Sequence, residues 1–458
     1  MVRSRLSMNN NFLYLNFINF TDVSLWDFKR YAAKKFASSY PIVKLGDYIQ
    51  EENTKVKPFD FPDKDFPILG VNNKTGLFDA YIEKGSNINQ PYKVVKDGFL
   101  AYNPYRVNVG SIGLKTAEQK YNYISPAYVV FSCRQGLLPE FLYILFRTAK
   151  FNALIRESTT GSVRQTLSFS SMGNIEIPLP TIERQMEFVD KYNSQIKLAE
   201  KQREEAKQLE TYMASDLMKL LGITLCRPQA SSFKDIKFVN YKDISRWDYD
   251  FNYLLSQEAI IWGNKYNVTK FGSTVCSYQY GTSNKASKEP SAYPVLRMNN
   301  IVNGELNTED LKYIHSLKQT ELDKLLLNRG DILFNRTNSK ELVGKTCVFN
   351  EEKKYIFASY LIRIKIDKSI ANPFFINYVF NSPIIRTQIN ATSRQVTCQA
   401  NINTSELDNF KIPLPPLKIQ EEIIYELDII KTRIRDLRLN ADANISSSRL
   451  EFERELFG

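Results

Sequence analysis

The stretch NIEIPLPTIERQ, residues 174–185, returns near the other end of the chain as NFKIPLPPLKIQ, residues 409–420. Both copies contain Ile-Pro-Leu-Pro, and both end in a glutamine, Gln185 or Gln420. Prolines at alternate positions exclude both a helix and an interior strand, so each copy is expected to close a globular part of the chain. The two glutamines lie 235 residues apart (420 − 185), which indicates that one structural unit occurs twice.

Further segments match in the same order in both halves. The pairs are FINFTDVSLWDF (17–28) with FVNYKDISRWDY (238–249), FPILGVNNKTG (66–76) with YPVLRMNNIVNG (293–304), DGFLAYNPYR (97–106) with RGDILFNRTN (329–338), and PEFLYILF (139–146) with PFFINYVF (373–380). The offset drifts only from 221 (238 − 17) to 235, which is typical of the duplication of a whole unit and not of a short-period solenoid. We expect Trp26 and Trp247 to anchor equivalent packing, and Asp27 and Asp248 to cap the turns that follow.

Each unit has the same predicted order of elements. Strands rich in β-branched and aromatic residues alternate with Gly, Asn and Pro turns, and a helical stretch follows at 139–155 and again at 373–388. After each Ile-Pro-Leu-Pro the apolar residues recur at steps of three, four or seven, which predicts helices over 182–221 and 417–456, each about 60 Å long. One such helix would suit a solvated surface element or a homodimer zipper, whereas two of equal length favour pairing with each other.

These patterns predict an α+β fold with two globular domains of mixed α/β structure and an internal repeat. The expected boundaries are 1–180 for the first domain, 181–222 for the central long helix, 223–415 for the second domain and 416–458 for the C-terminal long helix.

Composition indicates a globular protein with a basic charge balance. Of 458 residues, 43% are hydrophobic and 24% charged, and 61 Lys and Arg against 50 Asp and Glu give a net charge of +11. This excess is consistent with a polyanionic partner such as nucleic acid. No signal peptide and no apolar run of membrane-spanning length is found, so we expect a soluble protein. The cysteines lie far apart without a CxxC pair, which suits a reducing cytoplasm and argues against structural zinc and disulfides.

The usual signatures of catalysis are missing. His315 is the sole histidine, and no GxGxxG or GxxxxGK[ST] loop occurs. AYNPYRV (101–107) is similar to the Asn-Pro-Pro-aromatic loop of amino-methyltransferases, but Tyr105 replaces the second proline, so a turn is the better interpretation. EEK (351–353) after Asp331 fits a loose nuclease pattern but is absent from the first unit. We predict a non-catalytic chain without a metal site. The catalytic alternative is a self-contained nuclease or methyltransferase with duplicated DNA-binding domains. A further possibility is a coiled-coil scaffold that binds only protein.

The predicted loops carry planar amides, guanidinium groups and lysines next to aromatic residues and glycines. Arginine can bind guanine with two hydrogen bonds and Asn or Gln can do so with adenine, while Ser and Lys can hold phosphates. In the first unit the candidate DNA contacts are Asn72, Asn73, Lys74, Tyr105, Arg106, Asn108, Ser162, Arg164 and Gln165. In the second they are Arg297, Asn299, Asn300, Arg336, Asn338, Lys340, Arg394, Gln395 and Gln399. Asn72, Asn73 and their duplicates could instead form the turn after a strand.

Two non-identical units, each closed by Ile-Pro-Leu-Pro and followed by a long helix that begins TIERQ or PLKIQ, resemble the DNA-specificity subunit of type I restriction–modification enzymes. The related specificity subunits of type IIB systems are equally similar. The resemblance covers nearly the whole chain and implies two target-recognition domains, each of which reads one half of a bipartite double-stranded DNA site. It also implies two antiparallel long helices that set the gap between the halves and dock two modification subunits, which bring S-adenosylmethionine and methylate adenine. Restriction subunits would join the full complex, and this chain would bind no cofactor itself.

Overall fold

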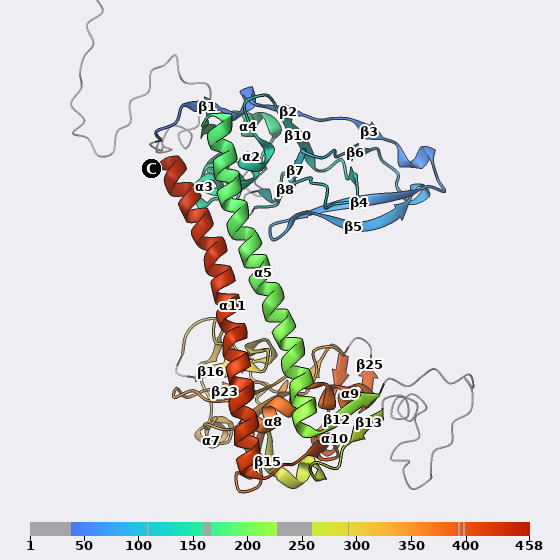
Figure 1. Cartoon of the computed structure of the whole chain (residues 1–458), viewed down its shortest axis with the longest axis vertical. Coiled ribbons are helices and arrows are strands. Elements are labelled where there is room, and N and C mark those ends of the chain that lie inside the picture. Colours follow the sequence, from blue (N-terminus) through green and yellow to red (C-terminus); the bar gives the residue numbers. More distant parts are fainter. Residues whose placement is uncertain are drawn as a thin grey trace, which may run out of the picture. The chain divides into compact units, whose positions relative to one another are not determined.

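A computed structural model describes residues 38–107, 110–158, 166–226, 259–291, 293–392, 394–396 and 399–458. The segments around Trp26 and Trp247, with the predicted caps Asp27 and Asp248, lie outside the described residues. By its contacts the chain divides into two compact units (Figure 1): unit 1 runs to Gln202 and includes Leu439–Gly458, and unit 2 is Arg203–Arg438. Each long helix is therefore shared between the units, whereas the predicted domain boundaries follow the helix ends.

Besides its share of the two long helices, the described part of unit 1 contains a four-stranded antiparallel sheet, a five-stranded mixed sheet and three short helices. Its elements are β1 (Ile42–Lys44), β2 (Ile49–Glu51), β3 (Lys55–Val56), β4 (Asp65–Asn72), β5 (Gly76–Lys84), β6 (Tyr92–Val94), β7 (Leu100–Tyr102), β8 (Ile112–Leu114), β9 (Tyr123–Ile124), β10 (Val129–Cys133), α2 (Pro139–Phe146), α3 (Ala149–Ser158), α4 (Phe169–Gly173) and β11 (Glu176–Pro178). The four-stranded sheet has the order β2-β10-β7-β8 and the five-stranded sheet the order β3-β6-β9-β4-β5, while β1 pairs with β11.

Unit 2 repeats this plan with smaller accessory sheets. Its elements are β12 (Ile223–Cys226), β13 (Ala259–Trp262), β14 (Val268–Lys270), β15 (Val275–Tyr280), β16 (Tyr293–Leu296), β17 (Ile301–Val302), β18 (Glu305–Leu306), β19 (Lys312–Ile314), α7 (Gln319–Leu325), β20 (Ile332–Asn335), β21 (Thr337–Asn338), β22 (Thr346–Val348), β23 (Ile356–Phe357), β24 (Leu361–Ile366), α8 (Pro373–Phe380), α9 (Pro383–Thr392), β25 (Arg394–Val396), β26 (Gln399–Asn401), α10 (Thr404–Asp408) and β27 (Lys411–Pro413). The main sheet has the order β15-β24-β20-β22.

The duplication seen in the sequence is a duplication of topology. The sheet β2-β10-β7-β8 corresponds strand for strand to β15-β24-β20-β22, and the pair β1-β11 corresponds to β14-β27. In both units the first half of Ile-Pro-Leu-Pro ends a two-stranded ladder, with Pro178 opposite Ile42 and Pro413 opposite Val268. A proline is tolerated there because a strand at the edge of a sheet need not donate a ladder hydrogen bond at its last residue.

The long helices α5 (Ile182–Leu221) and α11 (Leu417–Phe457) contact each other in both units (Figure 1). In unit 1, Lys191 of α5 forms ion pairs with Glu451 and Glu455 of α11, with N–O distances of 2.9 and 2.6 Å. In unit 2, Arg433 of α11 pairs with Glu205 of α5 at 3.0 Å. Residues early in α5 thus meet residues late in α11, so the two helices are antiparallel.

The glutamine that ends each repeated signature joins a long helix to the body of its unit. Gln185 is fully buried; its side-chain oxygen accepts from the Leu138 N–H (2.9 Å), and its Nε2 donates to the Gly136 and Pro180 carbonyls. Gln420 is also fully buried and makes the same three kinds of bond, to the Asn372 N–H and to two carbonyl groups. Leu138 and Asn372 are the N-caps of α2 and α8, so each glutamine fixes the start of a core helix against the start of a long helix.

Candidate nucleic-acid interface

The first predicted loop of unit 1 is the tip of the β4–β5 hairpin. The Asn72 side-chain oxygen accepts from the backbone N–H groups of Lys74 (2.8 Å) and Thr75 (2.7 Å), which is an Asx turn. Gly76 has a positive φ of 78°, which closes the hairpin without strain. The Arg147 guanidinium donates to the Asn73 carbonyl (2.9 Å) and so holds the tip against the end of α2. Asn72 therefore serves the turn, while the side chains of Asn73 and Lys74 are exposed.

The second predicted loop of unit 1 lies beside this hairpin. Tyr105 and Arg106 are both exposed, and the side-chain oxygen of Asn103 accepts from the Tyr105 N–H (3.0 Å), which confirms a turn at AYNPYR. The Ser111 hydroxyl donates to the Val71 carbonyl (3.3 Å), so the loop is tied to the end of β4. The first two loops of unit 1 are thus brought together at one place.

The chain that follows the third predicted loop also reaches this place. The Leu167 N–H donates to the Pro104 carbonyl (3.1 Å), and the Tyr102 hydroxyl donates to the Leu167 carbonyl (3.2 Å). Burial raises the pKa of Tyr102, so its hydroxyl keeps the proton it donates. The candidate contacts outside the described residues are Asn108, Ser162, Arg164 and Gln165.

In the first predicted loop of unit 2, two of the three candidates are engaged in the fold. Asn300 is buried, and its Nδ2 donates to the carbonyls of Asn307 (2.8 Å) and Asp310 (3.1 Å). The Arg297 guanidinium donates to the carbonyl (2.9 Å) and the carboxylate (3.0 Å) of Asp310. Only Asn299 of the three has an exposed side chain, so the turn interpretation holds for Asn300 and a DNA contact by Arg297 would require its ion pair to break.

The second and third predicted loops of unit 2 meet in one small sheet. The three-stranded sheet β21-β26-β25 places Asn338 opposite Ala400 and Gln395 opposite Ala400 on its other side. Arg394 lies opposite Asn401 and Gln399 opposite Val396 in the same sheet. Lys340 is exposed just beyond β21. Candidates that are more than fifty residues apart in sequence are therefore neighbours along the backbone.

Two tyrosines in this region, Tyr280 and Tyr360, were not among the predicted DNA contacts. The guanidinium carbon of Arg336 lies 5.0 Å from the centre of the Tyr280 ring, and the Arg336 N–H donates to the Tyr360 carbonyl (3.0 Å). Tyr280 and Tyr360 are 40% and 48% exposed, so both could contact a partner of this surface. The sequence offered only a weak sign that Tyr280 lies at this surface, since it ends a strand immediately before a glycine. Its contact with Arg336 depends on the order of the strands in the sheet, which the sequence does not show.

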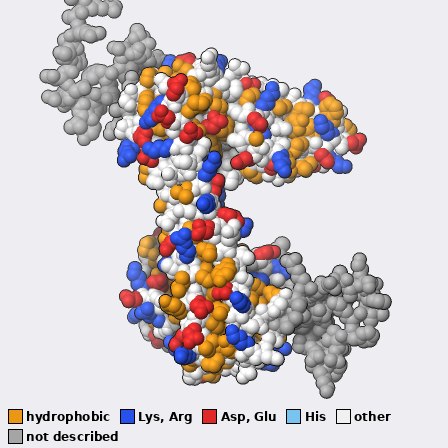
Figure 2. All heavy atoms as spheres, in the orientation of Figure 1, with side chains coloured by type: hydrophobic (Ala, Val, Ile, Leu, Met, Phe, Trp, Pro, Cys, Tyr) orange, Lys and Arg blue, Asp and Glu red, His pale blue; other side chains and the backbone are white. Residues whose placement is uncertain are grey.

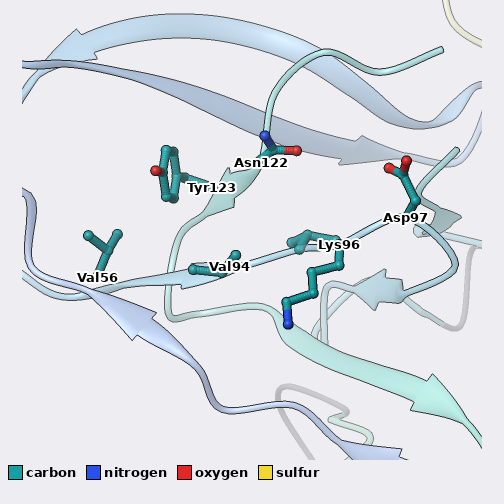
Figure 3. A pocket seen from close by; sticks show the side chains of 7 residues that line it. Val56, Val94, Lys96, Asp97, Asn122 and Tyr123 are labelled. Atoms are coloured by element: carbon teal, nitrogen blue, oxygen red, sulfur yellow. The ribbon is translucent and has the colours of Figure 1, made fainter. Parts of the chain in front are cut away.

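A hollow in unit 1 is lined by valines at one end and by Lys96, Asp97 and Asn122 at the other (Figure 3). Asp97 forms an ion pair with Lys115, with an Nζ–Oδ1 distance of 2.9 Å, so its charge is balanced within the unit. None of the candidate DNA contacts that the structure describes lines this hollow. Nothing in its chemistry points to a reaction.

The surface over the β4–β5 part of unit 1 mixes hydrophobic groups with charges of both signs (Figure 2). The exposed hydrophobic side chains there are Phe59, Phe61, Phe78, Tyr81 and Ile82. Lys64 lies 5.7 Å from the centre of the Phe61 ring, so part of this surface is covered by a lysine side chain. A mixed surface of this kind does not by itself select a polyanion.

Among the residues that the structure describes, no group of three or more His, Cys, Asp or Glu could hold a metal ion. His315 is exposed, and its Nε2 lies 3.1 Å from the Ser287 hydroxyl. Within the same described part of the chain, no helix is both long enough and apolar enough to cross a membrane.

Comparison with known proteins finds similarity in the second half of the chain. The family model described as the type I restriction modification DNA specificity domain matches residues 249–441. The putative type I restriction enzyme MjaX specificity subunit of Methanocaldococcus jannaschii is 28% identical over 144 residues, which are 31% of this chain and 34% of that protein. The EcoKI specificity subunit of Escherichia coli is 27% identical over 161 residues, 34% of each chain. This chain thus matches about a third of the length of these relatives.

A solved structure, reported for the complex assembly and conformational transition of a type I restriction–modification system, is similar over 92% of this chain and 97% of its own. The TM-score is 0.52 and the sequence identity 17%. At this identity the likeness concerns the fold alone, and it confirms the predicted α+β fold class.

Proposed function

We propose that this chain is a specificity subunit of a type I restriction–modification system, that it recognises a bipartite double-stranded DNA target, and that each unit reads one half; the match of residues 249–441 to the DNA specificity domain and the two related specificity subunits support this. The matched domain is a DNA specificity domain and the relatives are named specificity subunits, so the chain is not the catalytic subunit. A self-contained nuclease or methyltransferase finds no support in these matches. A scaffold that binds only protein would not need a DNA specificity domain.

One observation carries the two-reader proposal: the two units keep the same framework but differ at the same loop positions. The Leu167 N–H bonds the Pro104 carbonyl in unit 1, and the Ile402 N–H bonds the Arg336 carbonyl at the matching place in unit 2. Similar backbones with a proline in one loop and an arginine in the other would present different groups to DNA. Two different half-targets are the expected consequence.

The proposed DNA contacts are the candidates whose side chains are exposed or half-buried, apart from Asn72, which bonds within its turn, and Arg297, which is paired with Asp310, together with those that the structure leaves undescribed. In unit 1 they are Asn73, Lys74, Tyr105 and Arg106, with Asn108, Ser162, Arg164 and Gln165. In unit 2 they are Asn299, Arg336, Asn338 and Lys340, with Arg394, Gln395 and Gln399. Lys74 and Lys340 suit phosphates, whereas the amides and guanidinium groups suit base edges.

The long helices are proposed to fix the gap between the half-targets and to dock two modification subunits. Exposed large hydrophobic side chains on α5 and α11 support a protein partner, since water-exposed positions of a coiled coil are usually polar. They include Met186, Tyr212, Tyr425, Ile429, Leu439 and Leu450. S-adenosylmethionine would be bound by the modification subunits, and restriction subunits would complete the assembly.

Replacing Arg106 by alanine tests whether the readers are independent. We expect the complex of this chain with its modification subunits to lose sequence preference or affinity in one half of the target only. The reason is that Arg106 belongs to unit 1 and has an exposed side chain. The readout is the sequence of methylated or bound sites selected from a randomised bipartite library. The exposed Lys96, replaced by alanine, is the control and should leave both halves intact. Equal weakening of both halves would contradict the proposal.

Lengthening both helices tests the proposed ruler. Seven residues inserted after Gln202 in α5 and seven inserted between Arg438 and Asn444 in α11 keep the heptad pattern. Seven residues add about 10 Å of helix, which corresponds to about three base pairs of DNA. We expect the selected gap to lengthen while both half-target sequences stay unchanged, as read by mapping the modified sites. An unchanged gap in a folded, active complex would refute the ruler.

A further inference from the structure

We propose that Arg336, stacked on Tyr280 in unit 2, reads a guanine in the half-target of that unit and is a specificity-determining residue. This inference rests on the proposed function, because it assumes that unit 2 faces a DNA half-target. Its basis is a set of contacts around Arg336 that the other arginines of unit 2 described above do not share.

The backbone of Arg336 is held from two sides. Its N–H donates to the Tyr360 carbonyl (3.0 Å), and its carbonyl accepts from the Ile402 N–H (3.0 Å). The preceding residue, Asn335, is paired with Leu361 in the main sheet, and the following residue begins β21. The backbone of Arg336, from which the side chain extends, is therefore fixed between the main sheet and the three-stranded sheet β21-β26-β25. A fixed root reduces the entropy lost when the side chain binds a partner.

The guanidinium is oriented but not neutralised. Its carbon lies 5.0 Å from the centre of the Tyr280 ring, a distance at which the cation is attracted to the ring face. Among the described residues Arg336 forms no ion pair, and its Nε, which is shielded from solvent, has no hydrogen-bond partner. The Nε atoms of Arg297 and Arg363 also lack a partner, but these two arginines face carboxylates: Arg297 is paired with Asp310 (3.0 Å), and Arg363 lies beside Asp331 (3.9 Å). Arg336 is half-exposed and its guanidinium forms no ion pair among the described residues, so its charge and N–H donors are available to a ligand.

The chemistry of this site favours guanine among the bases. A guanidinium fork places two parallel N–H donors that match the N7 and O6 acceptors of guanine in the major groove. Tyr280, whose ring lies beside the guanidinium, is 40% exposed, and Tyr360, whose carbonyl accepts from the Arg336 N–H, is 48% exposed, so the surface around Arg336 is open to a partner. The contact with the Tyr280 ring restricts where the guanidinium can lie, and the planar fork itself suits recognition by two simultaneous hydrogen bonds.

In the described part of unit 1, the positions that match Arg336 and Tyr360 carry other residues. Pro104 occupies the place of Arg336, as its carbonyl accepts from Leu167 in the way that the Arg336 carbonyl accepts from Ile402. Ala127 takes the place of Tyr360, because Tyr128 and Leu361 make matching turn bonds to Ser125 and Ala358. A proline has neither the N–H that bonds Tyr360 nor a group that could bind a base edge. The guanine contact is therefore expected in one half-target only.

The test uses the full chain in complex with its modification subunits and a DNA library randomised over both half-targets. Wild type should select guanine at one position of the half-target that unit 2 reads. Arg336→Ala should lower the preference for that guanine roughly tenfold to a hundredfold, with the other half unchanged. Arg336→Lys should lose it as well, since a lysine cannot make the planar pair of bonds, and this charge-retaining variant covers the case in which the alanine variant does not fold. Arg329→Ala, which removes an exposed arginine of the same unit, is the matched control and should keep the guanine.

Three results would overturn the inference. One is a wild-type half-target of unit 2 without guanine. Another is an Arg336→Ala variant that keeps the guanine. The third is an Arg336→Ala variant that binds all sequences more weakly by the same factor, together with an Arg336→Lys variant that binds as well as wild type. That pair of results would assign Arg336 to a phosphate contact. If the wild-type complex selected no bipartite sequence at all, the proposed function itself would fail, so the two failures are distinguishable.

Discussion

Replacing Phe452 by alanine is expected to lower the free energy of unfolding of unit 1 by about 3–5 kcal/mol. Phe452 is only 3% exposed although it lies near the end of α11, some three hundred residues from the strands whose core it completes. Its ring centre lies 5.5 Å from that of Phe141 in α2 and 5.3 Å from that of Phe188 in α5. Removing this ring would leave a cavity where three helices meet.

The cost is large because nothing nearby can close the gap easily. Phe141 is fully buried and Phe188 nearly so, and their rings also contact each other, with centres 6.1 Å apart. Close-packed interiors relax only partly when a large side chain is truncated, so the contacts of the remaining rings are lost outright. The loss would fall on the attachment of both long helices to α2.

Hydrogen exchange measured by mass spectrometry separates the two units in this experiment. We expect Phe452→Ala to accelerate exchange in α2 and in the first half of α5, with little change in α8. Leu450→Ala is a matched control on the same helix, because Leu450 is 65% exposed and its truncation should cost at most about 0.5 kcal/mol. Equal effects of the two substitutions, or faster exchange in unit 2 alone, would contradict the assignment of this helix end to the core of unit 1.

Periodic features of the sequence predicted the long helices well. Helices over 182–221 and 417–456 were expected, and α5 and α11 span Ile182–Leu221 and Leu417–Phe457. Apolar spacing over forty residues is a strong local signal, and the repeat supplied it twice. The sharing of each helix between two compact units could not be predicted, because it depends on contacts such as those of Phe452 with α2, which no local pattern encodes.

The sequence predicted which loops carry the candidate DNA contacts, but not which of their side chains are exposed. Asn299 and Asn300 are neighbours of identical chemistry, yet one is exposed and the other is 2% exposed and bonds two carbonyls. The difference arises from the direction of each side chain in a short turn, which composition does not reveal. Tyr280 was missed for a related reason, because only the strand order of the main sheet brings it to Arg336.

Gln420→Leu is expected to destabilise unit 2 by about 3 kcal/mol, because it leaves three backbone groups, one buried and two part-buried, without their partners. The Asn372 N–H would lose its acceptor (2.8 Å), and the carbonyls of Ile370 (3.2 Å) and Pro415 (2.8 Å) would lose their donor. Leucine has nearly the volume of glutamine, so the cost would come from unmet hydrogen bonds and not from a cavity.

Gln420→Glu separates the roles of the two side-chain atoms. The glutamate keeps an acceptor for the Asn372 N–H but, when ionised, turns an oxygen toward two carbonyl groups that need a donor. We expect this variant to be less stable than wild type at neutral pH and to regain stability as the pH falls, since the protonated carboxyl can donate to one of those carbonyls. Unfolding by denaturant at several pH values is the measurement, and a pH-independent loss would refute this account of Nε2.

The repeat supplies a decisive internal control for the same idea. Gln185→Leu should speed hydrogen exchange at the start of α2, where Leu138 loses its acceptor, and Gln420→Leu should do so at the start of α8. Gln208→Leu, at an exposed position of α5, should change neither. If either buried glutamine could be replaced as freely as Gln208, the glutamine would be a marker of the helix start without a structural role. The paired, unit-specific losses expected here would instead explain why the signature NIEIPLPTIERQ and its partner NFKIPLPPLKIQ both end in glutamine: that residue binds the long helix to the unit that precedes it.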